Sequence, residues 1–501
     1  MAKHSLLLLL VMTSTIVMSQ SNLSVQPRTI VTTDGEIDDV DSFIRMLLYA
    51  NEYKLEGLIY SASMWHYKGD DHGTPFISEM EMTKKLYGQK TSLRWPGTQW
   101  MQGLIDAYEQ VYPNLSTHDR GFPTADYLRS LIKVGNIDFE GEMDRDTEGS
   151  DFIKAILLAN DPSPVYIQVW GGTNTVARAL KSIEAEYQDS NQWKTIYQKV
   201  CQKTILFTIL DQDATYKKYI APHWPGIKVM YNAHQFACLA YPWKRQVPQE
   251  MQTYLEGKFM SEQIIQGHGP LTKMYYSYGD GQKQAGDDEH IHGDPTKLKN
   301  TYWGSFEKYD FISEGDSPAF LHLVDVGLDN LDHPEYGGWG GRLIQSWVDP
   351  SRWEDGDLVA ELNPFTQKFD PAYPQTRWLP ALQQDFASRA DWCVKKYSEA
   401  NHPPQIMVHK KIISASPGKK LKLQASYSDP DKNKVQIKWW NYKEVGHSES
   451  VATLQQNNAG KALIKIPVTA VKGDTFHFIA EGTDDGVPAL TRYQRVIVMV
   501  Q

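Results

Sequence analysis

The sequence contains little cysteine and none of the short motifs that bind zinc. Its 501 residues include three cysteines, Cys201, Cys238 and Cys393, and an odd number excludes complete pairing within one chain. Cys201 and Cys238 could form a disulfide, and free buried thiols are an equally good interpretation. There is no CxxC pair, no zinc-type ligand spacing and no HExxH sequence. The sequence therefore gives no indication of zinc or thiol chemistry.

The chain also lacks an excess of basic residues. Lysine and arginine number 51 against 61 aspartates and glutamates, for a formal net charge of -10. A phosphate backbone requires a basic surface, so we expect no nucleic-acid partner. The 41% hydrophobic and 22% charged residues are typical of a globular protein, and the length indicates two or three domains. The 15 Trp and 27 Tyr residues mainly indicate core packing, although such rings also line sugar sites.

Long apolar runs are absent after the first twenty residues. The chain starts with MAKHSLLLLLVMTSTIVMSQ, in which Lys3 and His4 precede an apolar stretch over residues 6–17. Val17 and Ser19 satisfy a small-residue cleavage pattern, and the stretch is too short to span a bilayer. We therefore predict a signal peptide over residues 1–19 and a secreted or periplasmic protein with no membrane partner after cleavage.

Short β-branched segments alternate with amphipathic ones from residue 28 onward. RTIVTT predicts a buried strand, and the next segment places apolar residues on one helix face: Val40, Phe43, Ile44, Leu47 and Leu48. Further strands are predicted at 55–63, 164–170, 204–210 and 227–231, with helical segments between them. This alternation predicts an α/β domain over residues 20–400, built on a mostly parallel sheet.

Two later segments depart from this alternation. Residues 240–310 are rich in Gly, Asp, Tyr and His and are long for a connection, so we expect a lid or a binding insertion. NHPPQ (401–405) ends a helix and marks a linker. Short alternating segments such as KLKLQASYSD and RYQRVIVMV follow. They predict a small all-β sandwich of the immunoglobulin or cadherin kind over residues 401–501.

An acidic turn, TTDGEIDDVDSF, follows the first strand. Like charges this close repel one another. Asp38 or Asp39 could cap the next helix, but capping does not explain Asp34. Ligands of a parallel sheet lie beyond the carboxyl ends of its strands, and calcium binds six to eight oxygens. We therefore expect a calcium site at this turn. Other strand ends would complete it, with GGTNTVARAL after Trp170 and Asp316 in EGDSPAFL as the candidates.

DGEIDDV resembles the Asp-Pro-Gly-x-Asp-Asp signature of the inosine–uridine nucleoside hydrolase superfamily. The resemblance implies that Asp34 and Asp39 bind calcium and that Asp34 also takes the proton of the attacking water. It further implies that Asp38 holds the sugar hydroxyls. GGTNT resembles the family's Gly-Pro-Leu-Thr-Asn turn, which implies that Asn174 gives a backbone carbonyl to the metal. The GD of EGDSP resembles the family's late His-Asp pair, which implies Asp316 as a further ligand.

A closer resemblance is to secreted nucleoside-hydrolase-like proteins described as cellulose-binding. It extends from Arg28 to the end of the chain and is carried by these segments: DGEIDD, DQD (211–213), EGDSP (314–318), YGGWGGR (336–342), SDPD (428–431) and HFIAEGTDDG (477–486). Gly35-Glu36 replace the Pro-Gly of the hydrolase signature, and Thr32 replaces its opening Asp. The family's late His is Gly315 here, and its EFN sugar motif is absent. These departures leave furanosides and other glycosides as candidate substrates.

These observations predict a secreted calcium-dependent glycosidase. It would cleave an N- or O-glycosidic bond of a nucleoside-like or plant-glycan-derived carbohydrate, using metal-activated water. We expect substrate contacts from Asp38, Trp65, His66, Asp211, Asp213 and Glu314. Candidates for the acid that protonates the leaving oxygen are His66, His290, His292 and Glu314.

Two other functions fit the same sequence. The fold could hold a polysaccharide such as cellulose and do no chemistry, or it could be an inactive relative with a structural calcium ion. Retained activity predicts that Asp34→Asn abolishes turnover and leaves the fold intact. A pure binder predicts retention on an insoluble glycan without release of sugar or base.

Overall fold

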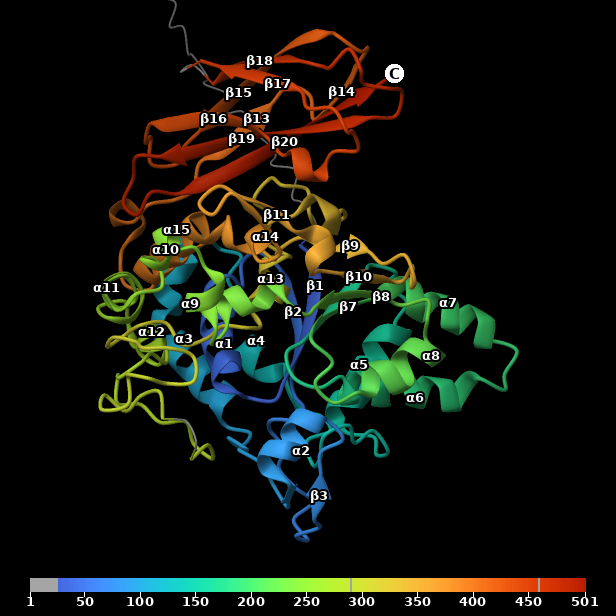
Figure 1. Ribbon diagram of the computed structural model, residues 1–501. Helices are drawn as coiled ribbons and strands as arrows, with labels where there is room; N and C mark the ends of the chain where they lie inside the picture. The colour runs from blue at the N-terminus through green and yellow to red at the C-terminus, as the bar shows by residue number, and fades with distance from the viewer. Residues whose placement is uncertain (1–25, 289–290, 458–459) are drawn as a thin grey trace, which may run out of the picture.

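The computed structural model describes residues 26–288, 291–457 and 460–501. The predicted signal peptide and His290 lie outside the described residues. Within the described ranges, no helix is long and apolar enough to cross a membrane. The chain forms an α/β body with a β-sandwich packed against one side of it (Figure 1).

An eight-stranded sheet forms the centre of the first body. Its strands are β1 Arg28–Thr33, β2 Lys54–Tyr60, β5 Ile132–Val134, β6 Val165–Val169, β7 Thr204–Ile209, β8 Lys228–Asn232, β9 Ile344–Gln345 and β10 Arg352–Glu354. They lie in the order β5-β2-β1-β6-β7-β8-β10-β9, and every neighbouring pair is parallel except β10 and β9. The predicted α/β fold with a mostly parallel sheet is therefore confirmed.

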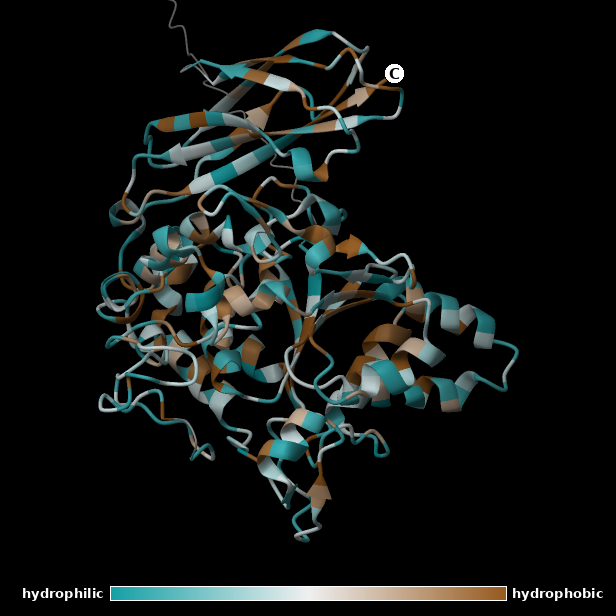
Figure 2. Cartoon of the chain, in the orientation of Figure 1, coloured by the Kyte–Doolittle hydropathy of each residue, from teal (hydrophilic) through white to brown (hydrophobic). Residues whose placement is uncertain are grey.

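Both faces of this sheet are covered because its strands are apolar on both sides. Ile30 and Val31, neighbours in β1, belong to two different hydrophobic clusters. One cluster is completed by α1 (Ile37–Leu48), α3 (Trp100–His118), α13 (Ser317–Leu321) and α15 (Leu379–Trp392). The other is completed by α5 (Glu148–Leu158), α6 (Asn174–Tyr187) and α7 (Trp193–Lys203). Figure 2 shows apolar residues along the sheet and on the helix faces turned toward it.

Residues 240–310 form short helices and loops beside α1 and α15, after the short helix η2 (Gln235–Leu239). Their elements are α9 Trp243–Gln246, α10 Gln249–Gln252, α11 Gly257–Phe259, η3 Met260–Ile265 and α12 Pro270–Lys273. The backbone N–H of Tyr276 donates to Asp41 of α1 at 2.8 Å. Gln284 donates from Nε2 to the carbonyl oxygen of Gly35 at 2.5 Å. The insertion therefore contacts the turn that follows β1.

Shorter elements fill the remaining connections of the α/β body. They are β3 Phe76–Ile77, α2 Glu81–Tyr87, β4 Gln89–Lys90, α4 Ala125–Ser130, η1 Tyr216–Ile220, α8 Ala221–His223, η4 Pro334–Tyr336, η5 Asp357–Val359, β11 Glu361–Asn363, β12 Lys368–Asp370, α14 Tyr373–Thr376 and η6 Tyr397–Glu399. Cys201, Cys238 and Cys393 are all buried and free. Of the two interpretations of the cysteines, the structure therefore supports free thiols.

The C-terminal part is a sandwich of two four-stranded sheets, as predicted. Its elements are β13 Gln405–Val408, β14 Ile412–Ala415, β15 Lys420–Ser428, β16 Val435–Asn441, η7 Lys443–Val445, β17 Thr453–Gln456, β18 Lys461–Lys465, β19 Thr475–Asp484 and β20 Thr491–Val500. The sheet orders are β13-β15-β18-β17 and β14-β20-β19-β16. In β15, Leu423 and Ala425 are buried while Lys422 and Gln424 are exposed, which is the alternation expected of a half-buried strand.

The sandwich and the α/β body are joined by specific contacts. The N–H of Tyr493 donates to the carbonyl oxygen of Val326 at 2.9 Å. The hydroxyl of Tyr442 donates to Glu361 at 2.7 Å. Tyr442 and Tyr493 also belong to the same hydrophobic cluster as α1 and α15. The two parts therefore share part of one core.

Candidate metal centre

The turn between β1 and α1 carries the acidic residues singled out in the sequence. Asp34 follows β1 directly and is 1% exposed. Gly35 has φ of 79°, a left-handed conformation that glycine adopts without strain. Asp38 and Asp39 lie in the first turn of α1, where the helix dipole favours negative charge.

Asp316 reaches the same place from a distant part of the chain. It occupies the N-cap position of α13, yet its side chain makes no capping hydrogen bond to that helix. One carboxylate oxygen from each of Asp38, Asp39 and Asp316 lies within 4.8 Å of the other two. The side chains of Asp39 and Asp316 are buried, and Asp38 is half-buried. We call Asp34, Asp38, Asp39 and Asp316 the acidic cluster.

The electrostatics of the acidic cluster are unfavourable without a cation. Burial raises the pKa of Asp39 well above its usual value, and the charges of Asp34 and Asp316 raise it further. Burial likewise raises the pKa of Asp316, to which Asp38 and Asp34 add. Asp38 follows the same pattern, with Glu36 as its largest charged neighbour. A bound cation would remove this penalty, because it pairs with several carboxylates at once.

Asp34 differs from its neighbours because His66 lies beside it. Burial raises the pKa of Asp34, but its polar neighbours, with His66 foremost, leave that pKa below its usual value. The Nδ1 atom of His66 is 3.7 Å from Oδ2 of Asp34 and 4.0 Å from Oε2 of Glu36. His66 is fully buried, and neither of its ring nitrogens has a hydrogen-bond partner among the described residues.

The donor set fits a hard divalent cation. All four members of the acidic cluster offer carboxylate oxygens, which are the ligands that calcium prefers. Oδ2 of Asp34 is buried and has no hydrogen-bond partner in the described part of the chain. The hydroxyl of Ser313 donates to Asp38 at 3.3 Å, and that of Thr33 donates to Asp39, so these two carboxylates are also oriented. An unpaired buried oxygen and oriented carboxylates are what a cation site requires.

The turn after β6 packs directly on Asp34. A Cβ atom on Gly171 would lie 2.8 Å from Cγ of Asp34, so only glycine allows this approach. Asn174 begins α6 and is fully buried. Its side chain donates to the carbonyl oxygen of Asn136 at 2.9 Å and accepts from the N–H of Thr175 at 2.9 Å. Its predicted role, a backbone carbonyl to the metal, stays a prediction.

Asp211 and Asp213, both predicted to contact substrate, bind backbone groups in this structure. Asp213 accepts from the N–H of Asn174 at 2.9 Å and from the hydroxyl of Thr215 at 2.7 Å. Asp211 accepts from the N–H groups that begin η1, at 3.3 and 3.1 Å. Burial and the charge of Asp213 raise the pKa of Asp211 to about 7. Asp213 therefore supports the start of α6, whereas Asp211 lines a separate cavity.

Glu314 lies two residues before Asp316, but its carboxylate is already occupied. Arg45 donates to it from Nε at 2.5 Å and from Nη2 at 2.9 Å. The hydroxyl of Ser317 donates at 2.6 Å, and the hydroxyl of Tyr275 donates as well. Glu314 is fully buried. This geometry favours a structural role over the substrate-contact and acid roles predicted for it.

Trp65 and His292 border the region without joining the acidic cluster. Trp65 is half-buried. Its backbone N–H donates to the hydroxyl oxygen of Ser63 at 2.9 Å, and this hydrogen bond holds the loop after β2. Burial lowers the pKa of His292 to about 4. Its ring lies 5.6 Å from that of Tyr241, centroid to centroid. His292 is therefore neutral at physiological pH, which disfavours the proposed acid role.

Three residues that we did not predict lie beside the acidic cluster. The hydroxyl of Tyr241 donates to Glu36 at 3.0 Å. Arg94 lies 3.7 Å from Glu36 and forms an ion pair with Asp287 at 2.8 Å. Glu36 stands within the acidic turn and was noticed only as a departure from the hydrolase signature. Arg94 and Tyr241 come from loops without a local sequence signal.

The fold and the acidic turn at the end of β1 define an α/β protein of the nucleoside-hydrolase-like class with an appended β-sandwich. The chain belongs to the family described as "Cellulose-binding Sde182, nucleoside hydrolase-like domain", which matches residues 28–343. Residues 420–500 match "Cellulose-binding protein Sde0182, C-terminal domain". The resemblance inferred from the sequence is therefore confirmed.

One solved structure gives the same picture of the fold. A nucleoside hydrolase-related hypothetical protein from Saccharophagus degradans, described as associated with carbohydrate metabolism, is 26% identical. The match covers 95% of this chain and 100% of that chain, with a TM-score of 0.68. Murine CRIg matches 20% of this chain and 99% of its own at 12% identity, with a TM-score of 0.15 that is too low to bear on the fold. No curated protein matches the chain.

Proposed function

We propose that the protein is an exported, calcium-dependent hydrolase of glycosidic bonds. The observation that carries this proposal is the convergence of Asp38, Asp39 and Asp316 on one point, with Asp34 beside them. Family membership supports the same class of chemistry, because the matching description is nucleoside hydrolase-like. The signal-peptide pattern at residues 1–19 supports export.

Three members of the acidic cluster are proposed as metal ligands, and one of them, Asp34, is also proposed as the base. Asp34, Asp39 and Asp316 are the proposed carboxylate ligands, with the backbone carbonyl of Asn174 as a fourth donor. A calcium ion held there would lower the pKa of a water molecule and fix it near the sugar. Asp34 would accept the proton of that water, because its lowered pKa keeps it ionised and its Oδ2 is unpaired among the described residues.

Substrate recognition falls to three residues around this centre, of which two are half-buried and His66 is buried. Asp38 is the half-buried member of the cluster, so it can accept a hydrogen bond from a sugar hydroxyl. His66 can donate to the sugar or to the leaving oxygen, because its ring nitrogens are unpaired. Trp65 is the adjacent half-buried ring and offers an apolar face. Neighbouring carboxylates stabilise the positive charge that develops on the sugar ring.

A substrate screen tests this proposal. Nucleosides, p-nitrophenyl furanosides and plant glycans are incubated with the purified protein, either in calcium or in chelator. The expected result is release of product in calcium only, and its loss in Asp34→Asn with the fold left intact, as checked by circular dichroism. Asp126→Asn is the matched control, because the Asp126 side chain is 91% exposed on α4. No release from any substrate would contradict the proposal.

The second candidate is a non-catalytic polysaccharide-binding protein. It is favoured by the cellulose-binding description of both matching families. The resemblance to the hydrolases also implies that Gly315 replaces their late histidine. This candidate predicts retention on cellulose without release of product. Calcium-dependent melting with neither retention nor release would instead indicate an inactive protein with a structural ion.

A further inference from the structure

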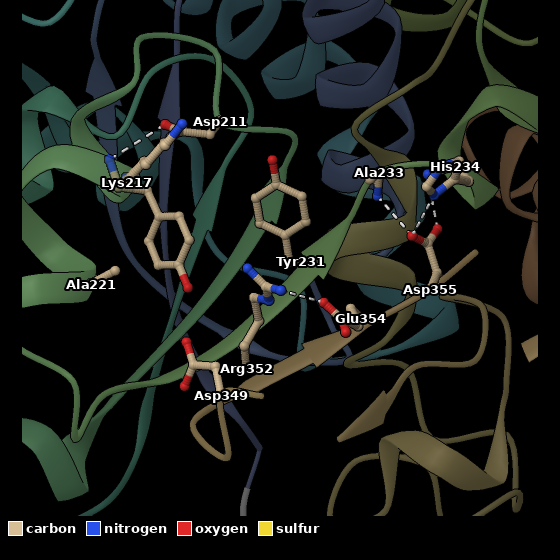
Figure 3. Close-up of a pocket in the computed structure, with 11 residues that line it drawn as sticks. Asp211, Lys217, Ala221, Tyr231, Ala233, His234, Asp349, Arg352, Glu354 and Asp355 are labelled. Carbon is tan, nitrogen blue, oxygen red and sulfur yellow. Dashed lines mark hydrogen bonds and ion pairs between the residues drawn. The ribbon is translucent and has the colours of Figure 1, made fainter. Parts of the chain in front are cut away.

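A cavity of about 390 Å³ lies beside β8 and β10, at the other end of the sheet from β5. The residues that matter for its chemistry come from the end of β7, from η1, from β8 and from the β9–β10 hairpin: Asp211, Tyr216, Tyr231, Asp349, Arg352 and Glu354. None of the four members of the acidic cluster lines it. Its volume lies within the range of small-molecule sites. Figure 3 shows Tyr231, Asp349, Arg352 and Glu354 side by side around it.

The polar groups of this cavity include both donors and acceptors. Arg352 pairs with Glu354 at 2.7 Å, but its buried Nε has no hydrogen-bond partner among the described residues. The carboxylate of Asp355 accepts hydrogen bonds from three backbone N–H groups at the start of η2, at 2.6 to 3.0 Å. Asp211 and Asp349 add two further carboxylates, and Lys217 adds a second cation. The cavity can therefore donate to and accept from the same ligand.

Aromatic rings form part of the same wall. The rings of Tyr216 and Tyr231 lie 5.9 Å apart, centroid to centroid, with 38° between their planes. The guanidinium of Arg352 lies 5.8 Å from the centroid of the Tyr231 ring. Flat apolar surfaces with polar edges are suited to a pyranose ring, which has apolar C–H faces and a rim of hydroxyls.

An exposed tryptophan lies two residues along the chain from a residue that lines this cavity. Trp347 is 85% exposed and Val348 is 77% exposed, in the loop that joins β9 to β10. Two residues after Trp347, Asp349 lines the cavity. Two residues of chain span at most about 7 Å, so the backbone of Trp347 lies within that distance of the backbone of Asp349. Trp347 and Val348 thus place two adjacent exposed apolar side chains on the loop that carries Asp349, and the indole offers a flat apolar face with a polar edge.

The mixed charges decide the class of ligand. Four carboxylates against two cations disfavour a phosphate or another anion. The guanidinium of Arg352 at the centre disfavours a metal ion. We propose that this cavity and Trp347 form a binding site for a neutral hexose polymer, with one sugar in the cavity and the chain continuing across the indole. The site does not depend on the acidic cluster or on hydrolysis.

Retention on microcrystalline cellulose tests this site. Trp347→Ala and Arg352→Met are expected to weaken retention about tenfold, as is usual for an anchor residue in a binding surface. Tyr302→Ala is the matched control, because Tyr302 is 79% exposed on the insertion and lies outside the cavity. It should be retained like the unaltered protein.

Titration with soluble cellohexaose, followed by NMR of the indole N–H of Trp347, gives a second measurement in the intact protein. The resonance is assigned by its loss in Trp347→Ala, and it should shift on addition of the oligosaccharide. Equal retention of all variants, or an unaltered protein that neither binds cellulose nor shifts this resonance, would overturn the proposal. Asp39→Asn should abolish hydrolysis and keep retention, so failure of the two proposals can be told apart.

Discussion

Asp39 is a buried carboxylate whose strongest charged neighbours are other carboxylates. Helix capping alone does not account for this arrangement, because α1 begins at Ile37 without any side-chain cap. Asp316 is similar, since it holds an N-cap position and does not cap. At the scale of single residues, a shared cation is the explanation that accounts for both side chains.

Glu140 offers a residue-scale test of the electrostatics away from the cluster. It is 6% exposed, and burial raises its pKa to about 7. The folded state therefore binds the proton more tightly than the unfolded state does, so stability falls as pH rises from about 4.5 to about 7. Glu140→Gln removes this loss. Between pH 4.5 and pH 8, its free energy of unfolding should therefore rise relative to that of the unaltered protein by up to about 3 kcal/mol.

Chemical unfolding at the two pH values measures this difference. The sign of this difference is informative. If folding lowered the pKa of Glu140, the variant would instead be less stable than the unaltered protein at pH 8, relative to pH 4.5. A variant whose stability follows that of the unaltered protein at both pH values would contradict the raised pKa of Glu140.

At the scale of elements, the turn between β6 and α6 holds Asp34 in place through Gly171. Gly171→Ala should reduce calcium affinity at least tenfold, because the new methyl group displaces Asp34, and should cost about 1–3 kcal/mol of stability. Gly103→Ala in α3 is the matched control. A Cβ there meets nothing within 4 Å, so about 0.5–1 kcal/mol of stabilisation is expected. Calcium calorimetry and thermal unfolding measure both effects, and unchanged calcium affinity in Gly171→Ala would contradict this role.

A second element-scale contact ties α1 to the segment before α13. Arg45 and Glu314 form a fully buried ion pair. Removing one partner leaves an uncompensated charge, so Glu314→Gln should destabilise the protein by about 3–5 kcal/mol. The double variant Arg45→Met with Glu314→Leu should recover most of that loss, because no unpaired charge remains. Urea unfolding of the three proteins provides the measurement, and a neutral single variant would show that the pair is not structural.

At the scale of the whole molecule, the sandwich and the α/β body share a core that includes Tyr442 and Tyr493. Arg492 of β20 adds an ion pair to Asp385 of α15 at 2.7 Å. We therefore expect one cooperative unfolding transition for the full chain, with equal calorimetric and van't Hoff enthalpies. Two separated transitions in calorimetry would show that the parts fold independently.

Most of the fold could be predicted because its information is local. The Phe43 face of α1, the strands of the parallel sheet and the alternation in β15 all follow from side-chain periodicity. The hairpin β9–β10 was missed because strands of two and three residues carry no periodic signal. Helix α3 was missed as well, and it contains both Gly103 and Pro113, which weaken a helical pattern.

The site was predictable only in part, because its geometry is non-local. Asp34, Asp38 and Asp39 stand out as one acidic turn, whereas Asp316 was only a weak candidate from its place before an apolar run and gained its ligand role from the family resemblance. No periodicity in the sequence indicates that Tyr241 and Arg94 contact Glu36. Nor does any indicate that Arg45 forms an ion pair with Glu314. Such contacts depend on how distant loops fold over the end of β1, which a single sequence does not encode locally.

Calcium titration of chelator-treated protein by calorimetry tests the central claim most directly. One ion should bind to the unaltered protein, and binding should be lost in Asp316→Asn, whose fold is checked by circular dichroism. If Asp316→Asn binds calcium as well as the unaltered protein, or if the unaltered protein binds none, the carboxylates at the end of β1 and the start of α13 do not form a metal centre.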